Sequence, residues 1–310
     1  MNKVHSALQN IQDKFPKAWL KKPNEIDILQ DLFDDFAKLG VWSHEKPEHH
    51  ALNRKLTPFS NYIWPHLNKE DLVLAAEFNN LSMLFDECIE SVDMEMAKTI
   101  TERFTNIFYM EKLEDNHNAL ENLAFVVCKR IRDRAGTRID LFNLLKGSVI
   151  DYFDSIIPFK NIKNLEGEPE MELFYFLRRN NIGLIAVANM TLLLTVRNLN
   201  IAIFLDPIWV KLLESISIIC SLYNDLFSYE KEVKEKDIKM NSFHFLQRLV
   251  IETYIQTFND QDKQEINEIF DHLHDILNAL LTWPLQSERY QSPDSIFKEL
   301  RKEPTNNHSE

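Results

Sequence analysis

The chain has 310 residues, of which 45% are hydrophobic, and it contains only 5 glycines and 11 prolines. This length suits one large domain, and the scarcity of glycine and proline argues against a fold of many tight turns, so we predict an all-α protein. The formal net charge of −13 argues against binding to nucleic acid and against stable association with an anionic membrane.

The N-terminal part is predicted to contain an arm, one helix and a long connection. Residues 1–23 are polar, with two prolines, and form the predicted arm. Asn24 is a candidate N-cap for a helix that ends at Gly40. Residues 41–69 contain three prolines and four histidines and are predicted to be a connection.

Helical periodicity dominates from residue 70 to residue 283, and no strand pattern is strong enough to predict. Pro158 is expected to end one of these helices and Pro284 the last one. The predicted domain covers residues 24–301, and the polar tail 302–310 is expected to be disordered. The predicted helices span residues 70–91, 95–111, 115–135, 138–157, 169–179, 183–197, 206–232, 239–258 and 262–283.

Cysteine usage and hydropathy indicate the compartment. The three cysteines lie far apart and form no CxxC pair, which favours a reducing environment. The first residues lack the apolar segment of a signal peptide. The longest uncharged run, residues 180–196, contains three asparagines and is predicted to be a buried helix rather than a membrane span. We therefore expect a cytoplasmic protein and leave open whether it forms a homodimer.

The predicted helix 70–91 carries an acidic motif near its end. One side of this helix is strongly apolar, and a weaker apolar stripe that includes Met83 follows the other side. Asp86 and Glu90 share a face and continue the weaker stripe, while Glu87 lies about 100° away. A carboxylate that points inward is unfavourable unless it meets a cation. A helix end that turns into solvent would carry the same residues without any function.

A second polar pattern lies in the predicted helix 206–232, after an apolar run typical of a buried helix. Asn224, Ser228 and Glu232 recur every four residues, so their side chains form one ladder with rungs about 6 Å apart. Amide, hydroxyl and carboxylate oxygens are hard donors that suit Mg²⁺. The same ladder would also fit an exposed helix face.

Several basic residues accompany the two oxygen-rich patterns, and each of them alone would fit a surface position. Two oxygen-rich patterns together with several cations indicate a bound polyanion that divalent metal bridges to the protein. These basic residues are Arg178, Arg179, Lys231 and Arg289, the last of which is followed by Tyr290.

These motifs resemble those of class I terpene synthases of the microbial type. Members of that family carry an Asp-rich motif on one helix and an N-D-x-x-S-x-x-x-E motif, commonly with Lys before the Glu, on a facing helix. A diphosphate-sensing Arg precedes the second motif by about 46 residues, and an Arg-Tyr pair lies near the C-terminus. The resemblance covers about two-thirds of the chain. The matching residues are Asp86, Glu87, Glu90, Arg178, Asn224, Ser228, Lys231, Glu232, Arg289 and Tyr290.

The resemblance implies a single-domain antiparallel helical bundle around a deep apolar cavity. Its implied substrate is a linear isoprenyl diphosphate, with farnesyl diphosphate as the expected chain length, which is ionised and cyclised with release of diphosphate. Three Mg²⁺ ions, or Mn²⁺ in their place, are implied. The implied metal ligands are Asp86, Glu87, Glu90, Asn224, Ser228 and Glu232. The implied substrate contacts are Arg178 or Arg179, Lys231, Arg289 and Tyr290, and Met83 and Trp283 are candidates for the apolar wall.

Two departures from the family pattern leave alternatives open. The acidic motif reads Asp-Glu-x-x-Glu, so Asp86 is the safest ligand, and either Glu87 or Glu90 could be a second one. The sensor is also ambiguous, because the spacing favours Arg178 whereas Arg179 lies closer to the helix break near Gly183.

Two other functions stay open at this point. A chain-elongating prenyltransferase would carry a second Asp-rich motif, where this chain offers Asn, Ser and Glu, so this alternative is disfavoured. A non-catalytic helical interaction protein would show no Mg²⁺-dependent binding of diphosphate.

Overall fold

The computed structural model describes residues 22–163 and 171–235, and all regular structure in these two ranges is helical. The predicted arm 1–23, except its last two residues, lies outside them, as do the tail 302–310 and the predicted helices 239–258 and 262–283. The described α-helices are α2 (Leu29–Lys38), α3 (Pro47–Leu56), α4 (Pro58–Ile63), α5 (Lys69–Glu90), α6 (Met94–Met110), α7 (Ala119–Ala135), α8 (Ile139–Lys163), α9 (Met171–Asn181), α10 (Leu184–Thr195) and α11 (Pro207–Glu235), and a 3₁₀ helix spans Ile201–Ile203.

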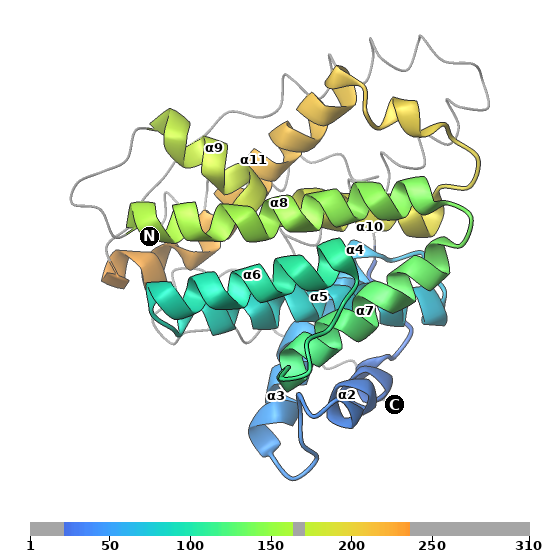
Figure 1. Cartoon of the computed structure of the whole chain (residues 1–310), viewed down its shortest axis with the longest axis vertical. Helices are drawn as coiled ribbons and strands as arrows, with labels where there is room; N and C mark the ends of the chain where they lie inside the picture. Colours follow the sequence, from blue (N-terminus) through green and yellow to red (C-terminus); the bar gives the residue numbers. More distant parts are fainter. Residues whose placement is uncertain (1–21, 164–170, 236–310) are drawn as a thin grey trace, which may run out of the picture.

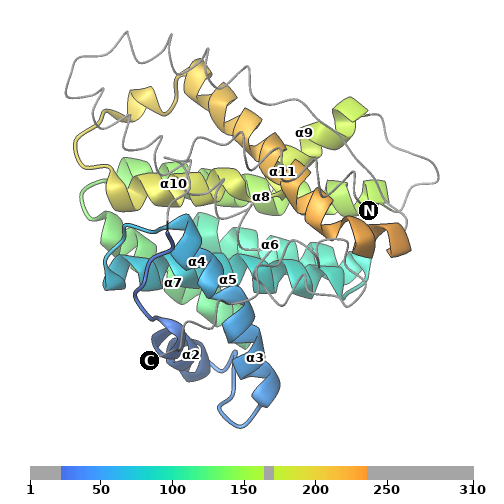
Figure 2. The ribbon, with the colours of Figure 1, turned by 180° about the vertical axis from the view of Figure 1, so that it is seen from behind.

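The long helix α8 crosses the middle of the bundle (Figure 1). It packs against α6 and α7 on one side and against α9 on the other, while α10 runs beside it. Seen from behind, α11 crosses diagonally over this layer and contacts α9 and α10 (Figure 2). The two motif-bearing helices, α5 and α11, therefore share α10 as a common neighbour.

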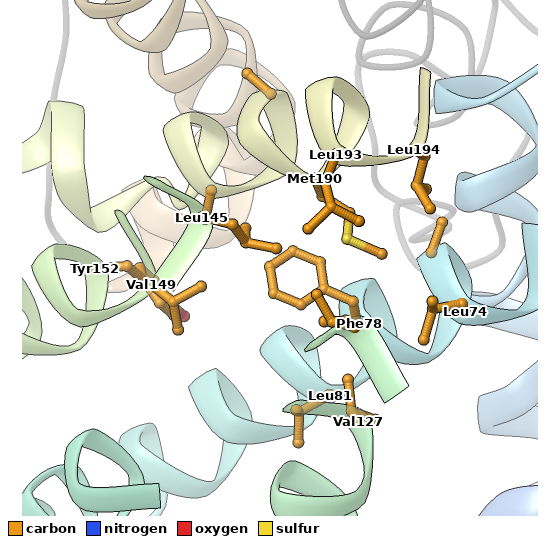
Figure 3. Packing of buried hydrophobic residues seen from close by; sticks show 14 of the residues in the cluster. Leu74, Phe78, Leu81, Val127, Leu145, Val149, Tyr152, Met190, Leu193 and Leu194 are labelled. Atoms are coloured by element: carbon orange, nitrogen blue, oxygen red, sulfur yellow. The ribbon is translucent and has the colours of Figure 1, made fainter. Parts of the chain in front are cut away.

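Helix α5 is buried on both of its predicted apolar sides. It begins where the Asn68 side chain accepts a hydrogen bond from the backbone N–H of Asp71. On the stronger side, the ring of Phe78 lies among Leu145 of α8 and Met190 of α10 (Figure 3). Residues of the weaker stripe, such as Leu72, Ala75 and Asn79, are also buried, which confirms the prediction of two-sided burial.

Two short helices replace the connection that was predicted for residues 41–69. Pro47 and Pro58 occupy the first turns of α3 and α4, and the prediction was wrong because it took these prolines as helix breakers. The first turn of a helix requires no N–H donor, and the fixed φ of proline suits it, so proline favours that position.

Helix α8 continues through Pro158 to Lys163, so the predicted end at residue 157 is also wrong. Proline inside a helix removes one hydrogen bond to the preceding turn, which usually ends or kinks the helix. Here the turn beyond the proline has tertiary partners: Phe159 is buried, and Lys160 donates hydrogen bonds to the end of α5.

Asn24 does not cap α2, which begins at Leu29 instead. Its side-chain Nδ2 donates to the carbonyl of Leu67 at 2.8 Å, and Nδ2 of Asn61 donates to the Asn24 carbonyl at 2.8 Å. The asparagine therefore fastens the extended segment before α2 to α4, which is a tertiary role that local capping patterns do not reveal. Gly40, with a φ of 77°, follows the C-cap of α2 and stops this helix, as predicted.

A buried carboxylate joins three of the helices. Glu77 of α5 is 2% exposed and forms an ion pair with Arg130 of α7, which also reaches Asp35 of α2 at 3.4 Å. Burial raises the pKa of Glu77 to about 7, against the opposing effect of the Arg130 guanidinium. The stability of this junction should therefore depend on pH.

Arg130→Met is expected to lower the free energy of unfolding by about 3 kcal/mol at pH 8, because it leaves the Glu77 carboxylate buried without a cation. A carboxyl group whose pKa is raised in the folded state stabilises the fold at low pH, and this stabilisation disappears as the pH rises through that pKa. At pH 5 Glu77 is mostly protonated and neutral, so the destabilisation caused by Arg130→Met should be smaller there than at pH 8. Urea denaturation at the two pH values measures it, with Arg54→Met at an exposed site of α3 as control. Equal losses at both pH values would contradict this account.

Candidate active site

The two adjacent arginines at the end of α9 contact different partners. Nη2 of Arg178 donates a hydrogen bond to Oδ1 of Asn224 at 3.2 Å, and Nη1 donates to Oδ1 of Asn181 at 2.9 Å. Nη1 of Arg179 donates instead to Oε1 of Glu214 at 2.8 Å. The geometry thus brings Arg178, rather than Arg179, to the first residue of the ladder on α11, and so supports the choice that the spacing favoured.

Helix α11 continues to Glu235, so Asn224, Ser228 and Glu232 belong to one uninterrupted helix as predicted. The Asn224 side chain is half-buried, and its amide oxygen is the atom that receives the Arg178 guanidinium. The side chains of Ser228, Lys231 and Glu232, and the whole of Trp283, Arg289 and Tyr290, lie outside the residues that the structure describes.

The acidic motif lies in the last two turns of α5. Asp86 is half-buried, whereas Glu87 and Glu90 are exposed, and Met83 is half-buried against the core. Among the described side chains, no three Asp, Glu, His or Cys residues converge on one point. The motif on α5 therefore does not form a complete metal site alone, and a metal here needs ligands from a second element.

Tyr152 of α8 lies near the acidic motif of α5. It is 7% exposed, and its ring centroid is 6.2 Å from that of Phe85, the residue before Asp86. Burial raises the pKa of Tyr152 well above its ordinary range; the carboxylates of Asp86 and Glu90 raise it further, and the Arg178 guanidinium opposes them. Charges from both α5 and α9 thus act on one phenol of α8.

Sequence reasoning missed three residues of α8 at this junction. Phe159 and Lys160 lie beyond residue 157, where their helix was expected to end, and Tyr152 lies inside the predicted helix but was not recognised as a residue of the site. The guanidinium of Arg178 lies 5.3 Å from the ring centroid of Phe159. A signal was present, because Tyr152, Ile156 and Phe159 follow the i, i+4, i+7 spacing of a buried helix face across the proline.

The described oxygen donors of the two motifs are of the kind that binds a hard divalent cation. They are the carboxylate of Asp86 and the amide oxygen of Asn224, both half-buried, and the adjacent Arg178 would complement an anion bound with the metal. Oxygen donors of this kind suit Mg²⁺ or Mn²⁺ better than the softer metals that cysteine and histidine select.

A family model described as terpene synthase family 2, C-terminal metal binding, matches residues 77–249, which is more than half of the chain. The chain belongs to the terpene synthase family. Terpene synthase 1 of Tieghemostelium lacteum is 30% identical, with 93% of this chain and 90% of that protein covered. Terpene synthase 1 of Dictyostelium purpureum is 28% identical, with 94% and 85% covered. The metal-binding description of the family implies a divalent metal in this terpene synthase as well.

The helical arrangement of this terpene synthase also occurs in solved structures. Linalool/nerolidol synthase from Streptomyces clavuligerus superposes with a TM-score of 0.71 over 86% of this chain and 99% of that one, at 11% identity. This likeness confirms the predicted class I terpene synthase fold, and at such low identity it shows the fold alone. No helix in the described part of the chain combines the length and hydropathy needed to cross a bilayer.

Proposed function

We propose that this terpene synthase ionises a linear isoprenyl diphosphate, with farnesyl diphosphate as its substrate, and cyclises the carbocation with release of diphosphate. The observation that carries the proposal is the hydrogen bond of 3.2 Å from Arg178 to the amide oxygen of Asn224. It joins an anion-binding guanidinium to a hard oxygen donor. Helix α8 links this contact to α5, because the ring of Phe159 lies under Arg178 and the next residue, Lys160, donates a hydrogen bond to the carbonyl of Ile89.

The chain offers residues for both the metal and the diphosphate. Magnesium, when bound, supplies positive charge that stabilises the leaving diphosphate as the allylic C–O bond breaks. Arg178 would turn its charge-assisted hydrogen bonds toward diphosphate oxygens. The proposed metal ligands are Asp86, Asn224, Ser228 and Glu232, with Glu87 or Glu90 as a further one. The proposed diphosphate contacts beside Arg178 are Lys231, Arg289 and Tyr290.

The carbocation needs an apolar surrounding that excludes water, because water would quench it. On the Asp86 side of α5, Met83 packs against the core and is proposed to line this wall, with Trp283 from the C-terminal region. The aromatic rings of Phe85 and Tyr152 lie next to the acidic motif. A ring face near the cation would contribute about 0.5–2 kcal/mol.

Incubation of the purified protein with Mg²⁺ and C10, C15 or C20 isoprenyl diphosphates tests the proposal. The expected result is a volatile hydrocarbon or alcohol from the C15 substrate, which EDTA abolishes and added Mg²⁺ or Mn²⁺ restores, because the leaving group depends on metal charge. Gas chromatography of an organic overlay measures the product. Absence of any such product from all three substrates would contradict the function, and a requirement for added isopentenyl diphosphate would identify an elongating prenyltransferase instead.

A further inference from the structure

The acidic motif of α5 lies where negative charge is electrostatically unfavourable. The C-terminal end of a helix carries carbonyl groups without intrahelical partners and the negative end of the helix dipole. The last turn of α5 contains Glu87 and Glu90 and no basic residue, and Asp93 follows shortly after it. This end of the helix therefore requires a cation from elsewhere in the fold.

Lys160 of α8 supplies that cation. Its Nζ donates hydrogen bonds to the carbonyl of Ile89 at 2.7 Å and to the carbonyl of Val92 at 2.6 Å. One carbonyl belongs to the last turn of α5 and the other follows the helix end, so a single ammonium group holds both sides of the terminus. A lysine at a helix C-terminus is favourable for both the carbonyl groups and the dipole.

Phe159, the residue before Lys160, contacts Arg178, the proposed diphosphate-binding residue on α9. The ring of Phe159 is buried, and the guanidinium of Arg178 lies over it at 5.3 Å from the centroid. Because Pro158 donates no hydrogen bond to the preceding turn, the last turn of α8 has fewer internal constraints, and these two contacts contribute to fixing its position.

We propose that Phe159 and Lys160 form a bridge that sets the position of the acidic motif of α5 relative to Arg178. Lys160 acts as a positioning residue for Asp86 and the glutamate beside it, and Phe159 positions the Arg178 guanidinium. This inference rests on the proposed function of these groups as metal and diphosphate ligands. Residues that orient metal ligands usually matter for metal affinity although they do not touch the metal.

The test compares Lys160→Met with Lys146→Met in the full-length protein. Lys146 is a second lysine of α8, 3.6 Å from Glu111 and remote from the motif, so it provides a matched control for the loss of one ammonium group from this helix. The first readout is amide hydrogen exchange of residues 88–93, without metal or substrate. Lys160→Met is expected to accelerate this exchange about tenfold, and Lys146→Met to leave it unchanged.

The second readout is the Mg²⁺ concentration that gives half-maximal turnover. It is expected to rise about tenfold in Lys160→Met and to recover in Lys160→Arg, which keeps the positive charge. Phe159→Leu is expected to weaken binding of inorganic pyrophosphate, measured by calorimetry with Mg²⁺, without changing exchange at residues 88–93.

The two readouts separate the bridge from the proposed function. Unchanged exchange at residues 88–93 in Lys160→Met would overturn the bridge, whether or not the wild-type protein turns over an isoprenyl diphosphate. If Lys160→Met does not fold, the amide exchange of Lys160→Arg at residues 88–93 decides. Wild-type exchange in Lys160→Arg would support the role of positive charge at the helix end, and faster exchange would overturn it. Accelerated exchange with unchanged Mg²⁺ dependence would also overturn the proposal, since the contact would then be structural only.

Discussion

Asn224→Ala and Asp86→Ala are each expected to lower turnover by about a thousandfold or more. The first removes the amide oxygen that Arg178 contacts on α11, and the second removes the half-buried carboxylate of α5. On each helix the next oxygen donor on the same face lies one turn away, so it cannot replace the donor that is lost. Alanine favours helix, so the circular dichroism of both variants should match that of the wild type.

The measurement is the rate of volatile product formation at saturating Mg²⁺, with far-ultraviolet circular dichroism on the same samples. Matched controls are Asn106→Ala at a half-buried asparagine of α6 and Asp133→Ala at an exposed aspartate of α7. Both controls should keep wild-type rates. Retained turnover in both Asn224→Ala and Asp86→Ala would show that the metal ligands have been assigned to the wrong residues.

Arg178→Met is expected to lower kcat/KM by about a hundredfold, which corresponds to the loss of charge-assisted hydrogen bonds worth about 3 kcal/mol. Arg179→Met is expected to change it by less than about threefold, because its ion pair with Glu214 is a partly exposed contact of small energy. The two residues are neighbours in the chain and have the same side chain. The same substitution at each position therefore measures the effect of where the guanidinium lies.

Steady-state kinetics with the C15 diphosphate measures both variants. Calorimetric binding of inorganic pyrophosphate with Mg²⁺ adds a readout that does not require turnover. The opposite order of effects, with Arg179→Met the more damaged, would make Arg179 the diphosphate sensor and would remove the support that the Arg178–Asn224 contact gives to the function.

The helices that carry the candidate site were accessible from the sequence because their motifs are periodic, whereas the roles of the site residues stay predictions. The four-residue spacing of Asn224, Ser228 and Glu232 and the shared face of Asp86 and Glu90 follow from helix geometry alone. The choice between Arg178 and Arg179 rested on spacing, and the contact with Asn224 now supports it. No local pattern could show this contact, because it joins residues 46 positions apart in the chain.

The errors in the fold prediction share one physical cause. Pro47, Pro58 and Pro158 were all interpreted as interruptions, yet two of them start helices and the third lies inside one. Proline only removes a donor and fixes φ, and the surroundings decide the outcome: a helix start needs no donor, and tertiary packing can hold the turn beyond an internal proline. Phe159 and Lys160 were overlooked for the same reason, since their helix was expected to end at residue 157.

The segment from Asn24 to Leu67 precedes the part of the chain that the family model matches, yet long-range contacts join it to the bundle. Nε1 of the buried Trp64 donates to Oγ1 of Thr191, 127 residues further along the chain, at 2.9 Å. Closing so large a loop costs conformational entropy before the contact contributes any stabilisation, so this segment should dock late as the polypeptide folds. A chain shortened to begin at Asn68, the N-cap of α5, would expose the surface that Trp64 covers and should aggregate during refolding.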